Sequence, residues 1–564
     1  MRTNRITIRP LVLVAVLVLI AAACNEGSDE PLDPAAAEAR LQEVVDDTDW
    51  RNDPVTRTAN VNLGAPVELS ETLPSIDEYA LTVAPSAGAD GVVAEVFVST
   101  EKSGEGTDGW MVEVADAFNS AGQTLADGRS AKVAIRRIAS GTGYQFIAAG
   151  QYLPDGFSPS NQLWVEMAAT HETMTPVADQ LVPNVAGIVM KTETADELRT
   201  ARGTLDAATL IEAVIAGDVV MGYTNPFASS TGLNFLLTVL DAFAEGQEDR
   251  LVAPDVASVF EEFQRRVPFV ALTTLQIRDS VERDNGTLDA FVMEYQTFVK
   301  TESLQSGFEF IPFGVAHDNP LYAVGDPSSD TREVLELFAA FADRQEYQDL
   351  AQEFGFDPPQ YSSDVAIPSG ETLIQAQQLW KDKKDGGRPV AAVFVTDVSG
   401  SMDGSKILAV QRALLSAQGF IAKDNAVGLV EFSDEVVVRL PISEFDLIQQ
   451  GKFVAAAEDM APAGGTAMYD GVAVGLSMLL EQREANPNAK LLLFVLTDGA
   501  TNEGHTLGDV DEMIAGLRIP VYTVGFEADL DELGELASLV EAASINASLD
   551  DVEFKIASLF NAGV

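Results

Sequence analysis

Short apolar runs alternate with longer amphipathic stretches through most of the chain. Residues 93–98, 132–137 and 219–223 each form a run with the length and composition of a buried strand. Each run is followed by a segment whose apolar residues recur at helical spacing, such as residues 110–119. Because strands alternate with helices, the pattern predicts an α/β fold.

The turns that follow these strands are rich in glycine and hydroxyl residues. The first turn of a helix presents unpaired N–H groups and a partial positive charge, so it can hold an oxyanion or a carboxylate. Serine and threonine add hydroxyl donors, and glycine lets a ligand approach the backbone. Ordinary N-capping is the alternative for each turn taken alone, because serine and threonine are preferred caps.

The last third of the chain repeats the pattern with longer apolar runs. Residues 390–396 are apolar throughout, which is expected for a central parallel strand covered on both faces. Helices are predicted after residue 402 and at residues 467–480. Further strands are predicted at residues 427–432, 436–440, 491–496 and 521–524. This order predicts a doubly wound sheet with helices on both faces.

Carboxylates and hydroxyls follow two of these strands. Asp397 and Asp498 each come directly after or close to a strand end, and ligands gather at the carboxyl edge of such a sheet. Two neighbouring carboxylates repel each other unless a cation neutralises them. The hydroxyls of Ser399, Ser401 and Thr466 complete an oxygen-only shell typical of Mg²⁺, with Mn²⁺ or Ca²⁺ as alternatives. No nitrogen or sulfur ligand is offered, which disfavours zinc.

These five residues resemble the metal-ion-dependent adhesion site of von Willebrand factor A (VWA) domains. Asp397, Ser399 and Ser401 match the DxSxS loop, Thr466 matches the second loop and Asp498 matches the third. The resemblance implies a bound cation with one open coordination position. It also implies a protein partner that supplies a carboxylate to that position, because a partly neutralised cation still attracts a negative oxygen.

The middle of the chain resembles the extracellular solute-binding proteins of bacteria, in the variety fused to a VWA domain. The likeness rests on the stretches VFVSTEKSG, ASGTGYQFIAAGQY, FSPSNQLW, NVAGIVM and GYTNPFASSTGLNFL, in this order. It implies two α/β lobes joined by crossing segments, with a ligand cleft between them. The cleft candidates are Ser99, Thr100, Ser140, Thr142, Ser160, Ser229, Ser230 and Thr231. The domain would bind a small solute or serve as a structural platform.

Net charge and cysteine content exclude several kinds of binding partner and covalent bond. The chain carries 87 acidic residues against 35 basic ones, a formal net charge of −52. Such a surface repels phosphate backbones and anionic lipids, so nucleic-acid binding is not expected, and membrane attachment must be covalent or hydrophobic. Cys24 is the only cysteine, which excludes an intrachain disulfide. The three histidines, His171, His317 and His505, are too scattered to predict a metal cluster.

The first thirty residues have the form of an export signal. Three arginines precede an apolar run at residues 11–20, and small residues lead up to Cys24. The run is short for a bilayer span. Small residues before the cysteine resemble a bacterial lipobox, which implies cleavage before Cys24 and attachment of lipid to its sulfur. A plain signal peptide or an uncleaved anchor is the alternative. The lipidated protein would lie on the extracytoplasmic face of the cell membrane.

The segments around the two folded regions complete the domain plan. Residues 25–83 are polar, acidic and interrupted by prolines, which predicts a flexible tether with some local helix at residues 35–45. Residues 359–388 predict a linker with a short helix, ended by a glycine pair. The predicted order is signal peptide 1–24, tether 25–83, solute-binding-protein-like domain 84–358, linker 359–388 and VWA domain 389–564.

The leading functional hypothesis is a lipid-anchored binding protein whose VWA domain engages a protein partner through its cation. The alternative is a solute receptor of the ABC-transport type, with the VWA domain as an accessory. An enzyme is not expected, because metal-assisted hydrolysis needs a placed general base or a second metal. Only His505 lies near the five residues in sequence, and it is interpreted as an exposed loop residue, as Asp434 is interpreted as a turn residue.

Overall fold

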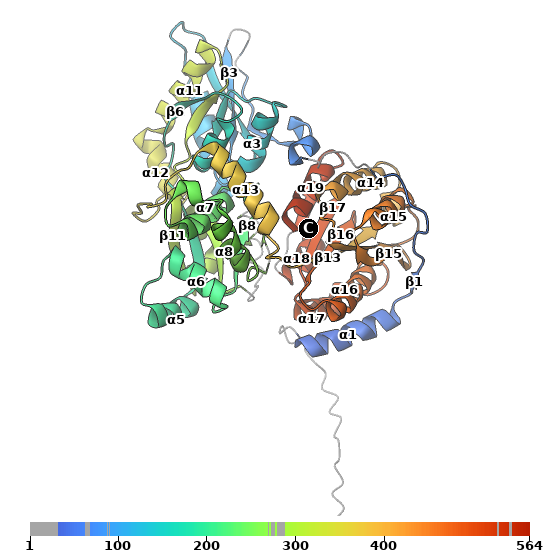
Figure 1. Cartoon of the computed structure of the whole chain (residues 1–564). Coiled ribbons are helices and arrows are strands. Elements are labelled where there is room, and N and C mark those ends of the chain that lie inside the picture. The colour runs from blue at the N-terminus through green and yellow to red at the C-terminus, as the bar shows by residue number, and fades with distance from the viewer. Residues whose placement is uncertain are drawn as a thin grey trace, which may run out of the picture.

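The structure, a computed structural model, shows two bodies side by side (Figure 1). It describes residues 32–61, 68–86, 88, 91–268, 270–271, 274, 277–278, 288–526, 530–540 and 544–563. The predicted signal peptide, with Cys24, lies outside the described residues. Among the residues that are described, no helix combines the length and apolarity needed to cross a bilayer.

The C-terminal body is built on a seven-stranded sheet with the order β1-β15-β14-β13-β16-β17-β18. The strands other than β1 are β13 (Val390–Asp397), β14 (Ala426–Phe432), β15 (Val436–Glu444), β16 (Lys490–Thr497), β17 (Val521–Phe526) and β18 (Ser544–Ala547). Strand β13 is buried along its whole length and pairs in parallel with β14 and β16, as its continuous apolar run predicts. Strand β15 is antiparallel to β14.

Helices cover both faces of this sheet. One face packs against α14 (Ser405–Ala417), α15 (Leu447–Glu458) and α19 (Val552–Gly563). The other face packs against α16 (Met468–Ala485), α17 (Leu507–Leu517) and α18 (Leu530–Ser538). Each layer buries its own apolar cluster, so the predicted doubly wound α/β architecture is present.

The segment expected to be a flexible tether is folded onto this body over residues 32–61, and the expectation is corrected there. Helix α1 (Pro34–Asp47) begins at the cap Asp33 and buries Leu41 and Val44 against α16 and α17. Strand β1 (Trp50–Asn52) then pairs in parallel with β15. An apolar stripe at helical spacing gives α1 a buried face, although the segment is acidic overall. The N-terminal region therefore completes the C-terminal domain.

The second body consists of two α/β lobes. The sheet of the first lobe has the order β2-β4-β3-β5-β12-β6, and the sheet of the second has the order β11-β7-β10-β8-β9. The first contains β2 (Leu81–Val83), β3 (Val92–Val98), β4 (Ala131–Arg137), β5 (Gly156–Ser158), β6 (Met174–Ala178) and β12 (Leu321–Val324). The second contains β7 (Val185–Lys191), β8 (Met221–Thr224), β9 (Val270–Ala271), β10 (Ala290–Glu294) and β11 (Phe308–Ala316).

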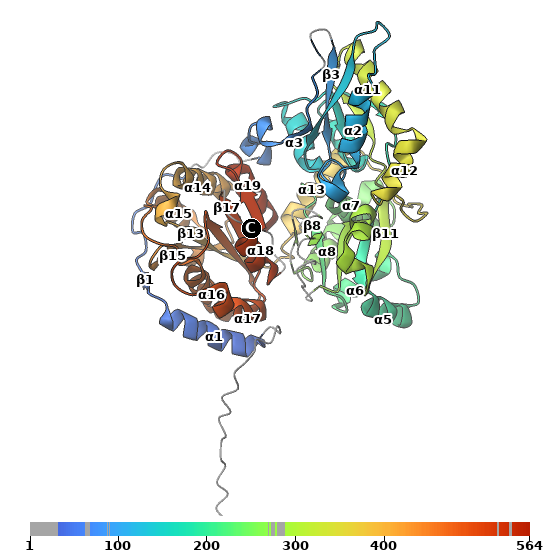
Figure 2. The same cartoon turned by 180° about the vertical axis from the view of Figure 1, so that it is seen from behind.

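The chain crosses between the lobes at residues 179–184 and again at residues 317–320. The α-helices around the sheets are α2 (Trp110–Ser120), α3 (Ser140–Ala149), α4 (Leu163–Ala168), α5 (Thr192–Arg202), α6 (Ala207–Ala216), α7 (Ser230–Ala244), α8 (Pro254–Gln264), α10 (Tyr295–Lys300), α11 (Ser329–Ala342) and α12 (Gln345–Glu353). Two crossings place β12, α11 and α12 back on the first lobe, as Figure 2 shows from behind. We call this body the two-lobed domain.

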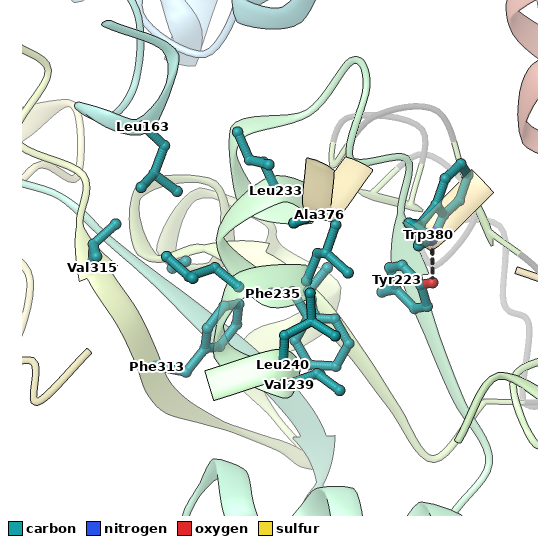
Figure 3. Packing of buried hydrophobic residues seen from close by; sticks show 14 of the residues in the cluster. Leu163, Tyr223, Leu233, Phe235, Val239, Leu240, Phe313, Val315, Ala376 and Trp380 are labelled. Carbon is teal, nitrogen blue, oxygen red and sulfur yellow. Dashed lines mark hydrogen bonds between the residues drawn. The ribbon is translucent and has the colours of Figure 1, made fainter. Parts of the chain in front are cut away.

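The expected linker is also part of the two-lobed domain. Helix α13 (Gly370–Lys383) packs against α4, α7 and α8. Its Trp380 is fully buried, and its indole N–H donates to the hydroxyl of Tyr223 at 2.6 Å (Figure 3). After α13 the chain returns to the C-terminal domain, where Asp385 accepts hydrogen bonds from Lys384 at 3.1 Å and Lys490 at 3.0 Å. The two-lobed domain is thus inserted between β1 and β13 of the C-terminal domain.

Candidate functional site

Three loops meet at the carboxyl edge of the C-terminal sheet. The Val398 carbonyl accepts from the Ala463 N–H at 2.8 Å, and the Gly464 carbonyl accepts from the Gly400 N–H at 3.0 Å. The third loop, which follows β16, joins through the Asn502 N–H, which donates to the Thr466 carbonyl at 3.0 Å. Backbone hydrogen bonds therefore hold all three predicted metal loops together.

Four of the five predicted ligands share one hydrogen-bond network. The hydroxyl oxygens of Ser399 and Ser401 lie 2.9 Å apart, and the Ser401 hydroxyl donates to Asp498 Oδ1 at 2.7 Å. Asp397 Oδ1 accepts from the Ser399 N–H at 2.7 Å, and its Oδ2 accepts from the Thr497 hydroxyl at 2.5 Å. Asp397 is fully buried whereas Ser401 is exposed, so the cluster lies at the base of a solvent-facing site.

Thr466 joins the site through its loop. Its N–H donates to Asn502 Oδ1 at 2.9 Å, and it is 4% exposed. Asp434 stabilises the same loop by accepting a hydrogen bond from the Gly465 N–H, so it acts as a turn residue that supports the second loop. The sequence offered no local signal for the roles of Asn502 and Thr497, because each depends on contacts between loops.

The charges at this edge favour a cation. Burial raises the pKa of Asp397, and the charge of Asp498 adds to this effect, while hydrogen bonds from Thr497 and Ser399 oppose it. Lys406 Nζ lies 2.6 Å from Asp498 Oδ2 and supplies one positive charge. Among the described residues no group of three or more His, Cys, Asp and Glu could hold a metal ion, so hydroxyls must complete any shell here. Such an oxygen-only set suits a hard divalent cation.

His505 differs from its interpretation as an exposed loop residue. Its side chain is 17% exposed, and Nδ1 lies 2.6 Å from Asp470 Oδ1. The Asp470 carboxylate also accepts from the His505 N–H at 3.0 Å. His505 is therefore oriented by Asp470, four residues beyond Thr466, and helps to fix the third loop.

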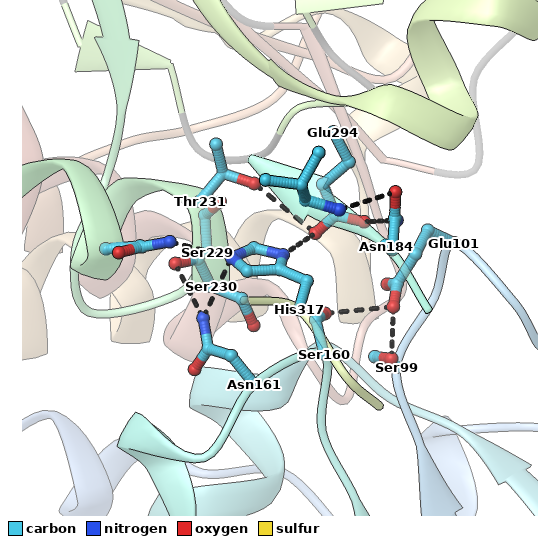
Figure 4. Close-up of polar contacts among 12 residues, drawn as sticks. Ser99, Glu101, Ser160, Asn161, Asn184, Ser229, Ser230, Thr231, Glu294 and His317 are labelled. Atoms are coloured by element: carbon cyan, nitrogen blue, oxygen red, sulfur yellow. Dashed lines mark hydrogen bonds and ion pairs between the residues drawn. The ribbon is translucent and has the colours of Figure 1, made fainter. Parts of the chain in front are cut away.

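The hydroxyl candidates of the two-lobed domain meet between the lobes, but most of them bind the chain itself (Figure 4). In the first lobe, the hydroxyls of Ser99 and Ser160 both donate to Glu101 Oε1, the second at 2.9 Å. Ser140 Oγ accepts from the Ser160 N–H at 3.3 Å. The side chains of Thr100 and Thr142 make no hydrogen bond to other described residues.

The helix N-termini of both lobes are also occupied. At the start of α3 the Gly141 N–H donates to the Ala228 carbonyl of the other lobe at 3.2 Å, and a Cβ at Gly141 would collide with the Phe227 carbonyl. At the start of α7, Ser229 Oγ accepts from the Gly232 N–H at 3.3 Å, which is an ordinary N-cap. The capping alternative holds for this turn.

Of the remaining two candidates, Ser230 contacts the first lobe and Thr231 contacts a residue of its own lobe. Ser230 Oγ accepts from the Trp164 indole N–H at 2.9 Å, and the Ser230 carbonyl accepts from Asn161 Nδ2 at 3.3 Å. Thr231 Oγ1 donates to Glu294 Oε1 at 3.3 Å. Six of the eight predicted cleft residues are therefore hydrogen-bonded within the chain.

The sequence analysis missed the charged centre of this region. Lys102 and His317 are fully buried, and Glu294 is 3% exposed. His317 Nδ1 lies 3.1 Å from Glu294 Oε1, and Asn184 Nδ2 donates to Glu294 Oε2 at 3.1 Å. These residues come from separate strand ends and crossing segments, so no local motif joins them.

Comparisons with known proteins identify the C-terminal domain. Residues 392–561 match the family model of the von Willebrand factor type A domain. The inter-alpha-trypsin inhibitor heavy chain H1 of Mesocricetus auratus is 32% identical over 151 residues, which are 25% of this chain and 16% of that protein. The match therefore spans less than a fifth of the length of this relative.

Solved structures resemble parts of this chain. The von Willebrand factor type A structure from Catenulispora acidiphila covers 31% of this chain and 41% of its own, with 21% identity and a TM-score of 0.27. The sulfate-binding protein SubI from Mycobacterium tuberculosis covers 47% of this chain and 87% of its own, with 15% identity and a TM-score of 0.33. The predicted α/β fold class is confirmed, and residues 392–561 are a von Willebrand factor type A domain.

Proposed function

We propose that this protein is a lipid-anchored, extracytoplasmic binding protein whose VWA domain binds a protein partner through a divalent cation. The observation that carries the proposal is the hydrogen-bonded cluster of Asp397, Ser399, Ser401 and Asp498 from two loops, to which backbone hydrogen bonds join the loop of Thr466. Asp397, Ser399, Ser401, Thr466 and Asp498 would hold the cation, with Mg²⁺ preferred and Mn²⁺ or Ca²⁺ as alternatives.

The bound cation would supply a positive charge that attracts a carboxylate of the partner. The chain's own residues prepare for this contact. Thr497 and the Ser399 N–H fix both oxygens of Asp397, and the exposed Ser401 leaves the site open to solvent. In the absence of the cation, Lys406 balances Asp498 and limits repulsion between the two carboxylates.

The two-lobed domain is proposed to serve as a structural platform. Six of its eight candidate hydroxyl residues are hydrogen-bonded within the chain, and both helix N-termini are capped internally. A transport receptor would need those groups for its solute. The platform therefore fits the contacts better than the solute receptor of the ABC-transport type.

The lipid anchor is proposed at Cys24, and α1 would keep the VWA domain near the membrane. Residues 25–33 can span at most roughly 30 Å. The start of α1 lies toward the amino edge of the sheet, because the Leu32 N–H donates to the Glu512 carbonyl in the middle of α17 at 3.3 Å and the Leu32 carbonyl lies beside Gly516 near the end of that helix. The end of α1 lies at the metal edge, where the Val436 N–H donates to the Asp49 carbonyl at 3.0 Å. The metal edge would therefore face away from the membrane.

Calorimetric titration of the soluble chain, beginning at residue 32, with MgCl₂ and MnCl₂ tests the cation site. One ion should bind per chain, and Asp397→Ala or Thr466→Ala should abolish binding without loss of helical signal in circular dichroism. Asp424→Ala removes an exposed acid of the same domain and should bind like the wild type. Equal binding by Asp397→Ala and the wild type would refute the proposal.

A further inference from the structure

The cleft between the lobes contains charged side chains where a solute-binding protein would hold its solute. Glu101 and Lys102 come from the turn after β3 and are 5% and 0% exposed. Ionised groups are rarely buried unless they are paired and hydrogen-bonded. Their position and burial indicate that they are fixed parts of the closed cleft.

The Glu101 carboxylate is bound as an oxyanion ligand would be. Its Oε1 accepts from the hydroxyls of Ser99 and Ser160, and Lys102 Nζ lies 3.6 Å from the same oxygen. Two hydroxyls and an ammonium form the kind of donor set that recognises a carboxylate. Both hydroxyls belong to the residues expected to bind a solute.

Lys102 is fixed independently of Glu101. Its ammonium donates to the Ser158 carbonyl at 3.0 Å and to Asn319 Oδ1 at 2.9 Å. Asn319 lies in a crossing segment, so the ammonium ties the first lobe to the hinge region. A fully buried ammonium without a counter-ion is strongly destabilising, and Glu101 supplies the counter-ion.

The second buried carboxylate does not compete for Lys102. Burial, reinforced by the charge of Glu101, raises the pKa of Glu294. Burial also disfavours the charge on Glu101, but Lys102 and the hydroxyl donors outweigh it and hold the pKa of Glu101 below its usual value. Glu101 is the carboxylate that lies beside Lys102, with 3.6 Å between Nζ and Oε1, so it can balance the lysine charge without an external ligand.

The lobes also bond to each other directly. The Gly141 N–H of the first lobe donates to the Ala228 carbonyl of the second at 3.2 Å. Trp164 donates to Ser230 Oγ at 2.9 Å across the same boundary. Hydrogen bonds between protein groups therefore hold the two lobes together without an external ligand.

We infer that the cleft is a carboxylate-binding site whose ligand is the chain's own Glu101 side chain. The two-lobed domain closes on this internal ligand and excludes free anions. The cradle itself remains specific for a carboxylate. Removal of the Glu101 side chain should therefore leave a site that takes a small free carboxylate such as formate or acetate. The inference rests on the contacts of the cleft and is independent of the cation site.

Thermal unfolding followed by tryptophan fluorescence tests the inference on the full soluble chain. Trp110, Trp164 and Trp380 are fully buried in the two-lobed domain, whereas Trp50 of the C-terminal domain is 43% exposed. A Trp50→Phe background therefore makes the signal specific to the two-lobed domain. Glu101→Ala should lower the unfolding temperature by about 5 °C or more. Sodium formate or acetate should restore several degrees, in a saturable manner, where sodium chloride at equal ionic strength does not.

The matched control is Glu105→Ala, which removes an exposed acid of the same turn. It should unfold like the wild type, and neither protein should respond to formate beyond the chloride effect. Equal unfolding temperatures for Glu101→Ala and the wild type would overturn the inference. So would a saturable response of the wild type to formate, or no response of Glu101→Ala.

If Glu101→Ala does not fold in chloride, refolding in formate gives the same test, and failure to fold in both salts counts against the inference. Glu101→Gln provides a second variant, because its amide fills the cradle without supplying the charge. It should be destabilised but should gain nothing from formate, since no cavity is present. Rescue of Glu101→Gln equal to that of Glu101→Ala would show that formate acts elsewhere and would contradict the inference.

Discussion

At the scale of single residues, Lys406 sets the charge of the metal edge. Its ammonium lies 2.6 Å from Asp498 Oδ2, where it neutralises one of the two carboxylates. A cation bound by Asp498 would lie close to the positively charged ammonium of Lys406. The lysine therefore stabilises the metal-free site and weakens attraction for the ion.

Lys406→Met is predicted to tighten cation binding several-fold, because it removes a repulsion of about 1 kcal/mol in a partly solvated site. Calorimetric titration with MnCl₂ measures the change. Lys423→Met, which removes an exposed lysine, should leave the affinity unchanged. Weaker binding by Lys406→Met would indicate that the lysine supports the ion instead.

Glu431 is predicted to make stability depend on pH. Burial raises the pKa of Glu431 from 4.5 to about 7, and Arg439 offsets this only in part. A group whose pKa is raised by folding stabilises the fold below its unfolded pKa, and this contribution is lost as pH rises from about 4.5 through 7. Glu431→Gln should therefore be more stable than the wild type at pH 8, by on the order of 3 kcal/mol.

Urea unfolding at pH 5 and pH 8, followed by circular dichroism, measures this difference. The control is Glu444→Gln, which changes an exposed glutamate of the neighbouring strand. Its stability should follow the wild type at both values. If Glu431→Gln kept the full pH dependence of the wild type, burial of this carboxyl would not be its cause.

At the scale of elements, α1 is the main addition to the VWA domain. Leu41 is 2% exposed and packs in the cluster shared with α16 and α17. Leu41→Ala should destabilise the C-terminal domain by about 2–4 kcal/mol, through lost burial and the cavity left behind. Gln42→Ala, on the exposed face of α1, should cost little. Equal urea midpoints for the two variants would mean that α1 is not docked in solution.

The alternation of strands and helices was enough to predict both α/β bodies, since each strand is a distinct apolar run. The same reasoning predicted helices at α1 and α13 but missed that they pack onto the folded domains. Both have apolar stripes, but a stripe does not say which surface it will meet. Trp380 of α13, for example, contacts Tyr223, and the sequence alone does not predict this pairing.

The two candidate sites also differ in how far they could be predicted from the sequence. Asp397, Ser399 and Ser401 lie within one motif, so the metal loop could be predicted from spacing. Glu101 and Lys102 adjoin predicted residues but were not assigned to the cleft, because their pairing depends on Ser160 and Asn319 from distant segments. Sequence spacing predicts sites built on one turn better than sites closed by several.

At the scale of the whole molecule, the position of the N-terminal segment predicts how the protein is oriented on a membrane. The N-terminal segment enters at the amino edge of the VWA sheet, opposite the metal edge. An eight-residue strand such as β13 separates the two edges by roughly 25 Å. With lipid on Cys24, the amino edge would lie nearer the membrane.

Energy transfer to labelled lipids tests this orientation in vesicles that carry the lipidated chain. Cys24 is the only natural cysteine, so an introduced cysteine is the one free thiol once Cys24 is lipidated. A dye at Ala485→Cys, at the end of α16, should transfer more efficiently than one at Glu503→Cys, near the metal edge. Equal transfer efficiencies from the two positions would contradict a fixed orientation. The Cys24→Ser variant, which lacks the lipid attachment site, should be released from the vesicles.

The central claim is that oxygens from three loops hold one divalent cation. Crystals grown with MnCl₂ and measured for anomalous scattering test it most directly. The account predicts a single strong peak among the side-chain oxygens of Asp397, Ser399, Ser401, Thr466 and Asp498, with direct Mn–O distances of about 2.0–2.3 Å. An ordered site without that peak, with Lys406 still paired to Asp498 in saturating Mn²⁺, would contradict it.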